Sequence, residues 1–160
     1  MQPQIGPDPQ LYLADICTHY LAYTDFDQAT FSKYNAYSYH SEDQESAEED
    51  AYPLLWYAAH YWDSHIHTID HAKRLLSNLE QILSPGKAEV WINQRRRYDR
   101  PRRLRDIALV FDIGWLAKII LTKVSPNLND EFTPDCLVKA VSASGNVFKI
   151  LLTDDHTKDI

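Results

Sequence analysis

The sequence is poor in glycine, has only two cysteines and lacks a long apolar run. Four glycines in 160 residues argue against a turn-rich β sandwich and against a glycine-rich phosphate loop. The two cysteines, Cys17 and Cys136, lie far apart in the sequence, and a disulfide between them is an alternative. Nothing near Met1 resembles a secretory signal. We therefore expect reduced, buried thiols in a cytoplasmic protein.

Membrane and nucleic-acid partners are both disfavoured by composition. The longest apolar stretch, residues 107–121, is too short to span a bilayer and contains Asp112 and Lys118. The net charge of −7 argues against nucleic acid as the main partner. An apolar fraction of 44% is enough for a packed core. Composition thus favours one domain, or one and a half, with no membrane crossing.

Apolar spacing predicts helices along most of the chain. A first amphipathic helix is expected from Gln10 to Leu21, capped by Asp8, with Pro9 in its first turn. A second is expected from Pro53 to near His65. A third, capped by Thr68, should carry Leu75 to Leu83 and end at residues 84–86, and a short fourth helix should hold residues 90–92. The predicted fold class is all-α.

Charge is sharply segregated. Residues 41–50 contain six acids and no base, which predicts a disordered, solvated loop. Seven of the eight arginines fall between residues 95 and 105, which gives a candidate patch for an anion or a partner. The patch consists of Arg95, Arg96, Arg97, Arg100, Arg102, Arg103 and Arg105. Its other interpretations are an exposed linker and a nuclear-targeting or nucleic-acid-binding segment.

The second half of the chain resembles degenerate ankyrin repeats. FDIGWLAKIIL at 111–121 resembles the turn and second helix of one repeat, and NLN at 127–129 resembles the following finger. Thr133-Pro134 resembles the T-P that opens the next repeat, and GNVFKILL at 145–152 resembles its turn and second helix. The resemblance implies helix pairs stacked through apolar faces.

The first half resembles the connector of fungal NACHT–ankyrin proteins, which are NLR-like signalling ATPases. YLADICTHYL at 12–21 and YPLLWYAAHYWDSH at 52–65 are similar to that family's Y-L-A-x-x-C-L-x-Y-L and Y-P-[FL]-L-x-Y-A-A-x-x-W-x-x-H segments. The resemblance implies a place between a winged helix and an ankyrin array. The phosphate-binding G-x-x-x-x-G-K-[ST] is absent, so ATP hydrolysis does not carry over, and the NACHT and winged-helix modules would lie upstream of this piece.

Three groups of residues each allow two interpretations. The cluster His60, His65, His67 and His71 could hold zinc, but ordinary surface or capping histidines are favoured. Cys17 and His19 point in different directions on a helix, so Cys17 is interpreted as a buried thiol. The aromatic face of Trp56, Tyr57, Tyr61 and Trp62 is interpreted as core, with a docking patch as the minority alternative.

These patterns predict a helical connector at 1–93, an arginine-rich linker at 94–105 and ankyrin-like repeats at 106–160. We expect the connector to be packed by Pro53, Leu55, Tyr57, Ala58 and Trp62, and the repeats by Leu116, Ile119, Ile120, Leu151 and Leu152. The expected function is a non-enzymatic, cofactor-free protein–protein interaction or scaffold segment in signalling. The expected location is cytoplasmic, with a nuclear, nucleic-acid-associated factor as the alternative.

Overall fold

The fold is helical throughout the part of the chain that the structure describes. A computed structural model describes residues 8–23, 52–95, 101, 103–128, 130–143 and 145–153. In these ranges there are helices and no strands, which confirms the all-α prediction. The predicted acidic loop at 41–50 lies outside them. The elements are α1 (Pro9–Leu21), α4 (Leu55–Tyr61), α5 (Ile69–Arg74), α6 (Leu76–Ile82), α7 (Pro85–Gln94), α8 (Leu104–Val110), α9 (Gly114–Thr122), the 3₁₀ turn η2 (Pro126–Leu128), α10 (Pro134–Ala143) and α11 (Asn146–Thr153).

The helices fall into two compact units. Unit 1 contains residues 1–67 and 75–98, and unit 2 contains residues 68–74 and 99–160. α5 belongs to unit 2, with the C-terminal helices. None of the described helices has the length and apolar character that crossing a bilayer requires.

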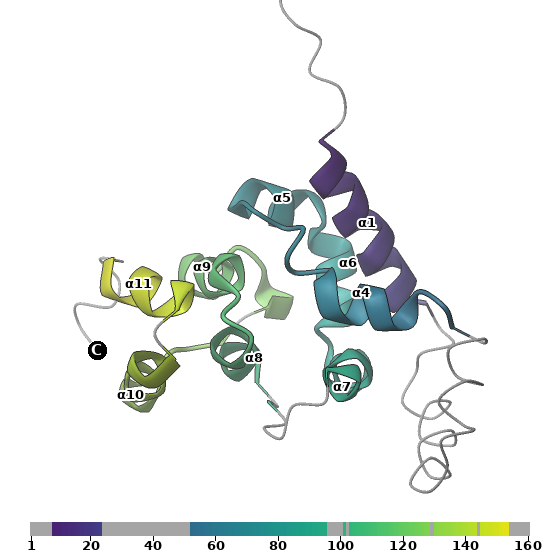
Figure 1. The fold of residues 1–160 in the computed structure, drawn as a ribbon. Helices are drawn as coiled ribbons and strands as arrows, with labels where there is room; N and C mark the ends of the chain where they lie inside the picture. Colours follow the sequence, from purple (N-terminus) through teal and green to yellow (C-terminus); the bar gives the residue numbers. More distant parts are fainter. Residues whose placement is uncertain are drawn as a thin grey trace, which may run out of the picture. The chain divides into compact units, whose positions relative to one another are not determined.

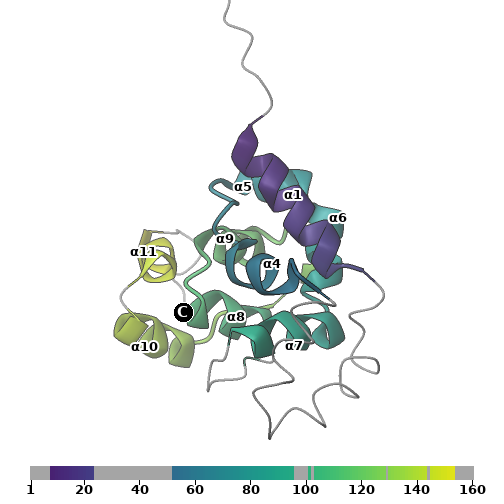
Figure 2. The ribbon, with the colours of Figure 1, turned by 45° about the vertical axis from the view of Figure 1, so that its right-hand side comes forward.

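In unit 1 four helices close a ring. α1 packs against α4 and α6, and α7 packs against the same two helices (Figures 1 and 2). At the centre Trp62 and Trp91 meet edge to face, with ring centroids 5.2 Å apart. The Trp91 indole nitrogen donates to the carbonyl of Ile82 at 2.9 Å, so its polar group is satisfied inside the core. The buried apolar side chains of this unit are Ala14, Cys17, Leu21, Leu55, Ala58, Ala59, Trp62, Ile66, Leu75, Leu79, Ile82, Leu83, Ala88, Val90, Trp91 and Ile92.

The first helix begins as the sequence predicts. Pro9 is its first residue, and the Asp8 carboxylate accepts a hydrogen bond from the backbone nitrogen of Gln10 at 2.9 Å. Its buried face includes Cys17, which is free and only 3% exposed. Burial raises the pKa of the Cys17 thiol from 9.0 to about 11. The interpretation of Cys17 as a buried thiol is therefore confirmed.

The third predicted helix is interrupted. Thr68 caps its start, since its hydroxyl accepts from the backbone nitrogen of His71 at 3.1 Å. Continuity through Leu83 is wrong, because Leu75 has φ −98° and ψ 11° and separates α5 from α6. α5 packs on α9 in unit 2, whereas α6 packs on α1 and α7 in unit 1. The break allows consecutive segments to bury their apolar faces in different units.

Unit 2 is built from two helix pairs. The first helices of the pairs, α8 and α10, pack together, and so do the second helices, α9 and α11 (Figure 1). α5 packs on α9. α10 begins at Pro134 and α11 directly after Gly145. The expected packing residues are buried except Leu152, which is 63% exposed, so that assignment is wrong.

A carboxylate from the first pair caps the last helix. Asp112, in the turn between α8 and α9, accepts hydrogen bonds from the backbone nitrogens of Asn146 at 2.9 Å and Val147 at 3.0 Å. It also accepts from the Asn146 side-chain amide at 3.0 Å. A Cβ on Gly145 would lie 2.2 Å from the Asp112 carboxylate, so only glycine leaves room for this cap. The two helix pairs are thus joined through the N-terminus of α11.

Candidate interaction surface

Helix α4 has one buried face and one exposed aromatic face. Leu55, Ala58 and Ala59 are buried, as is Trp62 just after the helix, which matches a spacing of three and four residues. The opposite side exposes large apolar side chains. They are Leu54 (47% exposed), Trp56 (52%), Tyr57 (37%) and Tyr61 (41%). We call these four residues the α4 aromatic patch.

The prediction that the aromatic side chains of this helix form core is wrong for most of them. Trp62 is fully buried as predicted, but Trp56, Tyr57 and Tyr61 are not core residues. Pro53 is also exposed, and it lies in the turn before α4 rather than in its first helical turn. That turn is closed by a hydrogen bond from the Leu55 nitrogen to the Tyr52 carbonyl at 2.9 Å. The buried face is formed by Leu55, Ala58, Ala59 and Trp62, so the side chains on the other side of the helix remain exposed.

The aromatic rings of the patch contact one another. Trp56 stacks on His60 with centroids 4.4 Å apart, and it meets Tyr61 edge-on at 5.9 Å. Tyr57 and Tyr61 lie 5.1 Å apart. Such contacts hold the rings in place, so a partner would lose little side-chain entropy on binding there. The result is a preorganised aromatic surface.

A histidine ties this surface to α1. The Tyr57 hydroxyl lies 2.9 Å from Nε2 of His65, and Nδ1 of His65 lies 2.7 Å from the Gln10 side-chain oxygen. With that oxygen as acceptor, Nδ1 carries the proton and Nε2 accepts from Tyr57. Burial, with the charge of His67 second, lowers the pKa of His65 below 6.5, while Asp63 opposes the shift. The neutral ring is the form that fits this bridge.

Arg95, the first residue of the predicted arginine patch, is part of the fold of unit 1. Its guanidinium donates to the carbonyls of Ala59 at 2.6 Å and His60 at 3.1 Å, and it forms an ion pair with Asp63. The Arg95 side chain is only 9% exposed, and its Cζ lies 5.3 Å from the centre of the Trp91 ring. It therefore stabilises the C-terminal end of α4 rather than facing a ligand.

Arg105 is also engaged within the fold. Asp130 accepts a hydrogen bond from the Arg105 backbone nitrogen at 3.0 Å and pairs with its guanidinium at 3.5 Å. The same guanidinium donates to the Glu131 carbonyl at 2.5 Å. Arg103 is exposed and precedes α8. The remaining members of the predicted patch, Arg96, Arg97, Arg100 and Arg102, lie outside the described residues.

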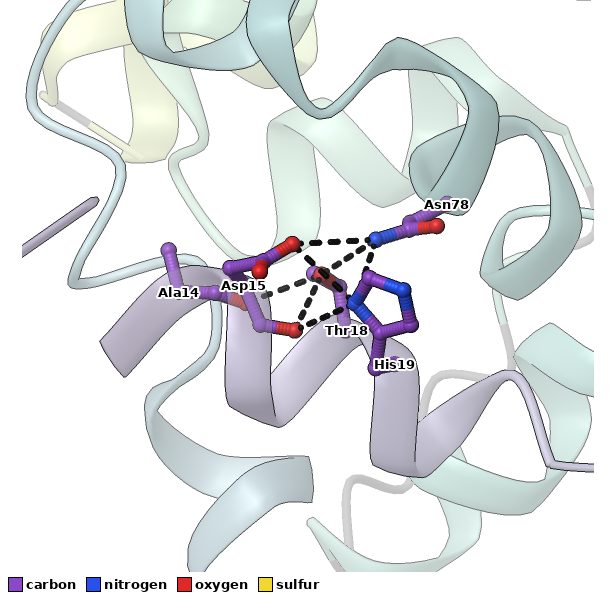
Figure 3. A network of polar contacts seen from close by, with 5 residues as sticks. All are labelled: Ala14, Asp15, Thr18, His19 and Asn78. Carbon is purple, nitrogen blue, oxygen red and sulfur yellow. Dashed lines mark hydrogen bonds and ion pairs between the residues drawn. The ribbon is translucent and has the colours of Figure 1, made fainter. Parts of the chain in front are cut away.

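A second polar cluster joins α6 to α1, as Figure 3 shows. The Asn78 amide nitrogen lies 3.4 Å from the Asp15 carboxylate and from the Thr18 hydroxyl, and 2.9 Å from Nδ1 of His19. Nδ1 of His19 lies 3.0 Å from the Asp15 carboxylate. The buried Thr18 hydroxyl donates to the Ala14 carbonyl at 2.9 Å, so it is not oriented as a nucleophile. The cluster is a tie between helices.

The predicted alternatives based on histidine find little geometric support. His60 bonds through Nδ1 to the Trp56 carbonyl at 2.8 Å, and His65 bridges Tyr57 and Gln10. Within the described ranges, no three His, Cys, Asp or Glu side chains are grouped as metal ligands would be. His60 forms a contact within α4, whereas His65 connects Tyr57 to Gln10 of α1.

The patch could have been found in the sequence. The positions Leu55, Ala58, Ala59 and Trp62 share one helix face, and adjacent alanines are typical of a face that packs closely against a neighbour. Assigning that face to the core leaves Trp56, Tyr57 and Tyr61 outside.

Comparison of the chain with protein-family models, characterised proteins and solved structures finds no match.

Proposed function

We propose that this chain is a non-catalytic protein–protein interaction module and that the α4 aromatic patch is its docking surface. The observation that carries the proposal is the exposure of four large apolar side chains, three of them aromatic, on one short helix and its N-cap residue. Tyrosine and tryptophan are enriched at protein interfaces because they bury much area with few rotatable bonds. The ring contacts within the patch add preorganisation.

The architecture of unit 2 supports a scaffold role. Stacking of first helix on first helix and second on second is the arrangement by which helical repeats build an array. It supports the proposed relation to ankyrin repeats, and with the connector-like segments at 12–21 and 52–65 it supports a place in an NLR-like signalling protein. We propose a cytoplasmic module that would link upstream NACHT and winged-helix domains to a protein partner.

The experiment is a selection of displayed peptides against the full chain, followed by counter-screening on variants. We expect selected ligands to lose binding when Trp56 and Tyr61 are both changed to alanine. A matched control changes Val138 and Val141, which are 72% and 59% exposed on α10. Ligands that bind the Trp56/Tyr61 variant as well as wild type, or that are lost in the Val138/Val141 variant instead, would refute the assignment of the docking surface.

A further inference from the structure

We propose that the outer face of α10 and α11 binds a further helix pair, of the same type as the two pairs of unit 2 and presented by a partner polypeptide. The outer face consists of Val138 and Val141 of α10 and Leu152 of α11, which are all exposed. It belongs to unit 2, whereas the α4 aromatic patch belongs to unit 1.

The two helix pairs of unit 2 repeat one pattern at an interval of 31 residues. The Thr122 hydroxyl, at the end of α9, donates to the Lys118 carbonyl at 2.7 Å. The Thr153 hydroxyl, at the end of α11, donates to the Lys149 carbonyl at 2.9 Å. Both lysine side chains are exposed. Buried side chains of the second helices follow the same interval, in the pairs Leu116 and Val147, and Ile120 and Leu151.

The same interval relates each residue of the outer face to a more buried apolar residue of the first pair. Ile107 of α8 is 2% exposed, whereas its counterpart Val138 is 72% exposed. Val110 and Leu121 are partly buried, whereas their counterparts, the other two members of the outer face, are exposed. The apolar character of these positions is therefore repeated in the second pair, but their burial is not.

The two pairs also differ in what packs on them. α8 packs against α10, and α9 packs against α11 (Figure 1). Among the described helices, the main packing partners of α10 and α11 are α8, α9 and each other. Each unit of a stacked helical array packs on its neighbours, and a unit at the end of an array has a polar outer face. The apolar outer face of the second pair is therefore typical of an internal unit, which favours another helix pair as its occupant.

One position adds a polar requirement. Ala108 is fully buried, but its counterpart Lys139 is exposed. Lys139 follows Val138 directly and is rotated by about 100° from it around the helix, so it lies beside the outer face. Burying an unpaired charge is costly. We therefore expect the partner to place apolar side chains on Val138 and Val141 and a polar or acidic one beside Lys139.

The test extends the full chain with a second copy of residues 130–153, placed directly after Ile160. This junction keeps the interval of 31 residues between α10 and the copied first helix. In the copy, Val138→Gln, Val141→Gln and Leu152→Gln give a polar outer face. The covalent link holds the probe at a high effective concentration. A control extension contains the same residues in scrambled order.

We expect the extension to add helical signal in circular dichroism and to slow hydrogen exchange of the α10 backbone amides by about 10-fold or more, because the outer face is removed from water. The scrambled extension should do neither. Val138→Gln with Val141→Gln in the original α10 should abolish both effects. In the unextended chain the same two substitutions should move the midpoint of thermal unfolding by less than about 4 °C, because both side chains are exposed there.

Several results would overturn the inference. An extension that adds no helix, or that protects α10 no more than the scrambled one, would mean that the outer face does not accept a helix pair. Protection that survives Val138→Gln with Val141→Gln would place the contact elsewhere. A dimer of the unextended chain that dissociates on these two substitutions would make a second copy of the chain the occupant. The α4 aromatic patch is unchanged in all of these chains, so its docking function is tested separately.

Discussion

The carboxylate of Asp112 should be worth about 2 kcal/mol to unit 2, and the structure separates that figure into two parts. The first part is the cap, since Asp112 accepts from the backbone nitrogens of Asn146 and Val147 at 2.9 and 3.0 Å. Replacing a capping carboxylate by alanine costs about 1 kcal/mol. The second part is backbone conformation, because Asp112 has a φ of 54°. Alanine tolerates this left-handed conformation less well than aspartate does, by about 1 kcal/mol.

Three substitutions at Asp112 distinguish these contributions. Asp112→Ala loses both and should lower the midpoint of thermal unfolding of unit 2 by about 10 °C. Asp112→Gly loses the cap but accepts the positive φ, so its cost should be about 1 kcal/mol. Asp112→Asn keeps one acceptor oxygen and the tolerance for positive φ, so it should be the mildest. Hydrogen exchange at the Asn146 and Val147 amides reports the cap directly and should accelerate in the alanine and glycine variants.

A double-mutant cycle with Gly145 tests the geometry. A Cβ at Gly145 would lie within 2.3 Å of the Asp112 carboxylate, so Gly145→Ala must displace the cap in the wild-type background. In the Asp112→Gly background there is no carboxylate to displace, and the same substitution should cost less, with a coupling of about 0.5–3 kcal/mol. Additive effects of the two substitutions, or unaltered exchange at Asn146 and Val147 in Asp112→Ala, would refute the reasoning.

Further predictions follow from burial and protonation. Trp62→Ala should lower the free energy of unfolding by about 3–5 kcal/mol in a denaturant titration, because Trp62 is fully buried against Trp91. Trp56→Ala should lower it by less than about 0.5 kcal/mol. Equal costs would contradict the assignment of faces on α4. A thiol reagent at neutral pH should modify Cys17 only on unfolding, because the thiol is 3% exposed and its pKa is raised to about 11; rapid modification of the native chain would contradict this. Because the pKa of His65 is lowered in the folded chain, His65 takes up a proton in the unfolded chain first as the pH falls. The stabilising contribution of His65 is therefore complete above about pH 6.5 and is lost below it. A stability difference between wild type and His65→Gln that does not shrink between about pH 7.5 and about pH 5.5 would exclude that linkage.

Local rules in the sequence were sufficient for three of the helix starts. Asp8-Pro9, Thr68 and Pro134 each mark the beginning of a helix in the structure, because a side-chain acceptor or a preset φ acts within one turn. Apolar spacing was sufficient for Cys17, Leu116, Ile119, Ile120 and Leu151, which are all buried. Fold class followed from these two signals, which depend on neighbours in the sequence.

Features that depend on distant contacts could not be predicted in this way. The break at Leu75 arises because α5 and α6 pack in different units, and nothing in residues 68–83 encodes that choice locally. Leu152 looks like its buried neighbour Leu151 in the sequence, yet it points to solvent. The roles of Arg95 and Arg105 depend on carbonyls and carboxylates 25 or more residues away. The run of arginines therefore indicated a positively charged segment. It did not indicate that Arg95 and Arg105 form contacts within the fold.

Both units use charged side chains from distant segments to satisfy helix ends. In unit 1, Lys87 and Arg95 donate to carbonyls at the C-terminal ends of α1 and α4, where the helix dipole is negative. In unit 2, Asp112 and Asp130 accept from backbone nitrogens at the N-terminal ends of α11 and α8, where it is positive. Each of these charges comes from a segment distant in sequence from the helix that it caps. Short helices of seven to thirteen residues have little stability of their own, so capping side chains that cross between elements fix the tertiary arrangement as well as the helix ends.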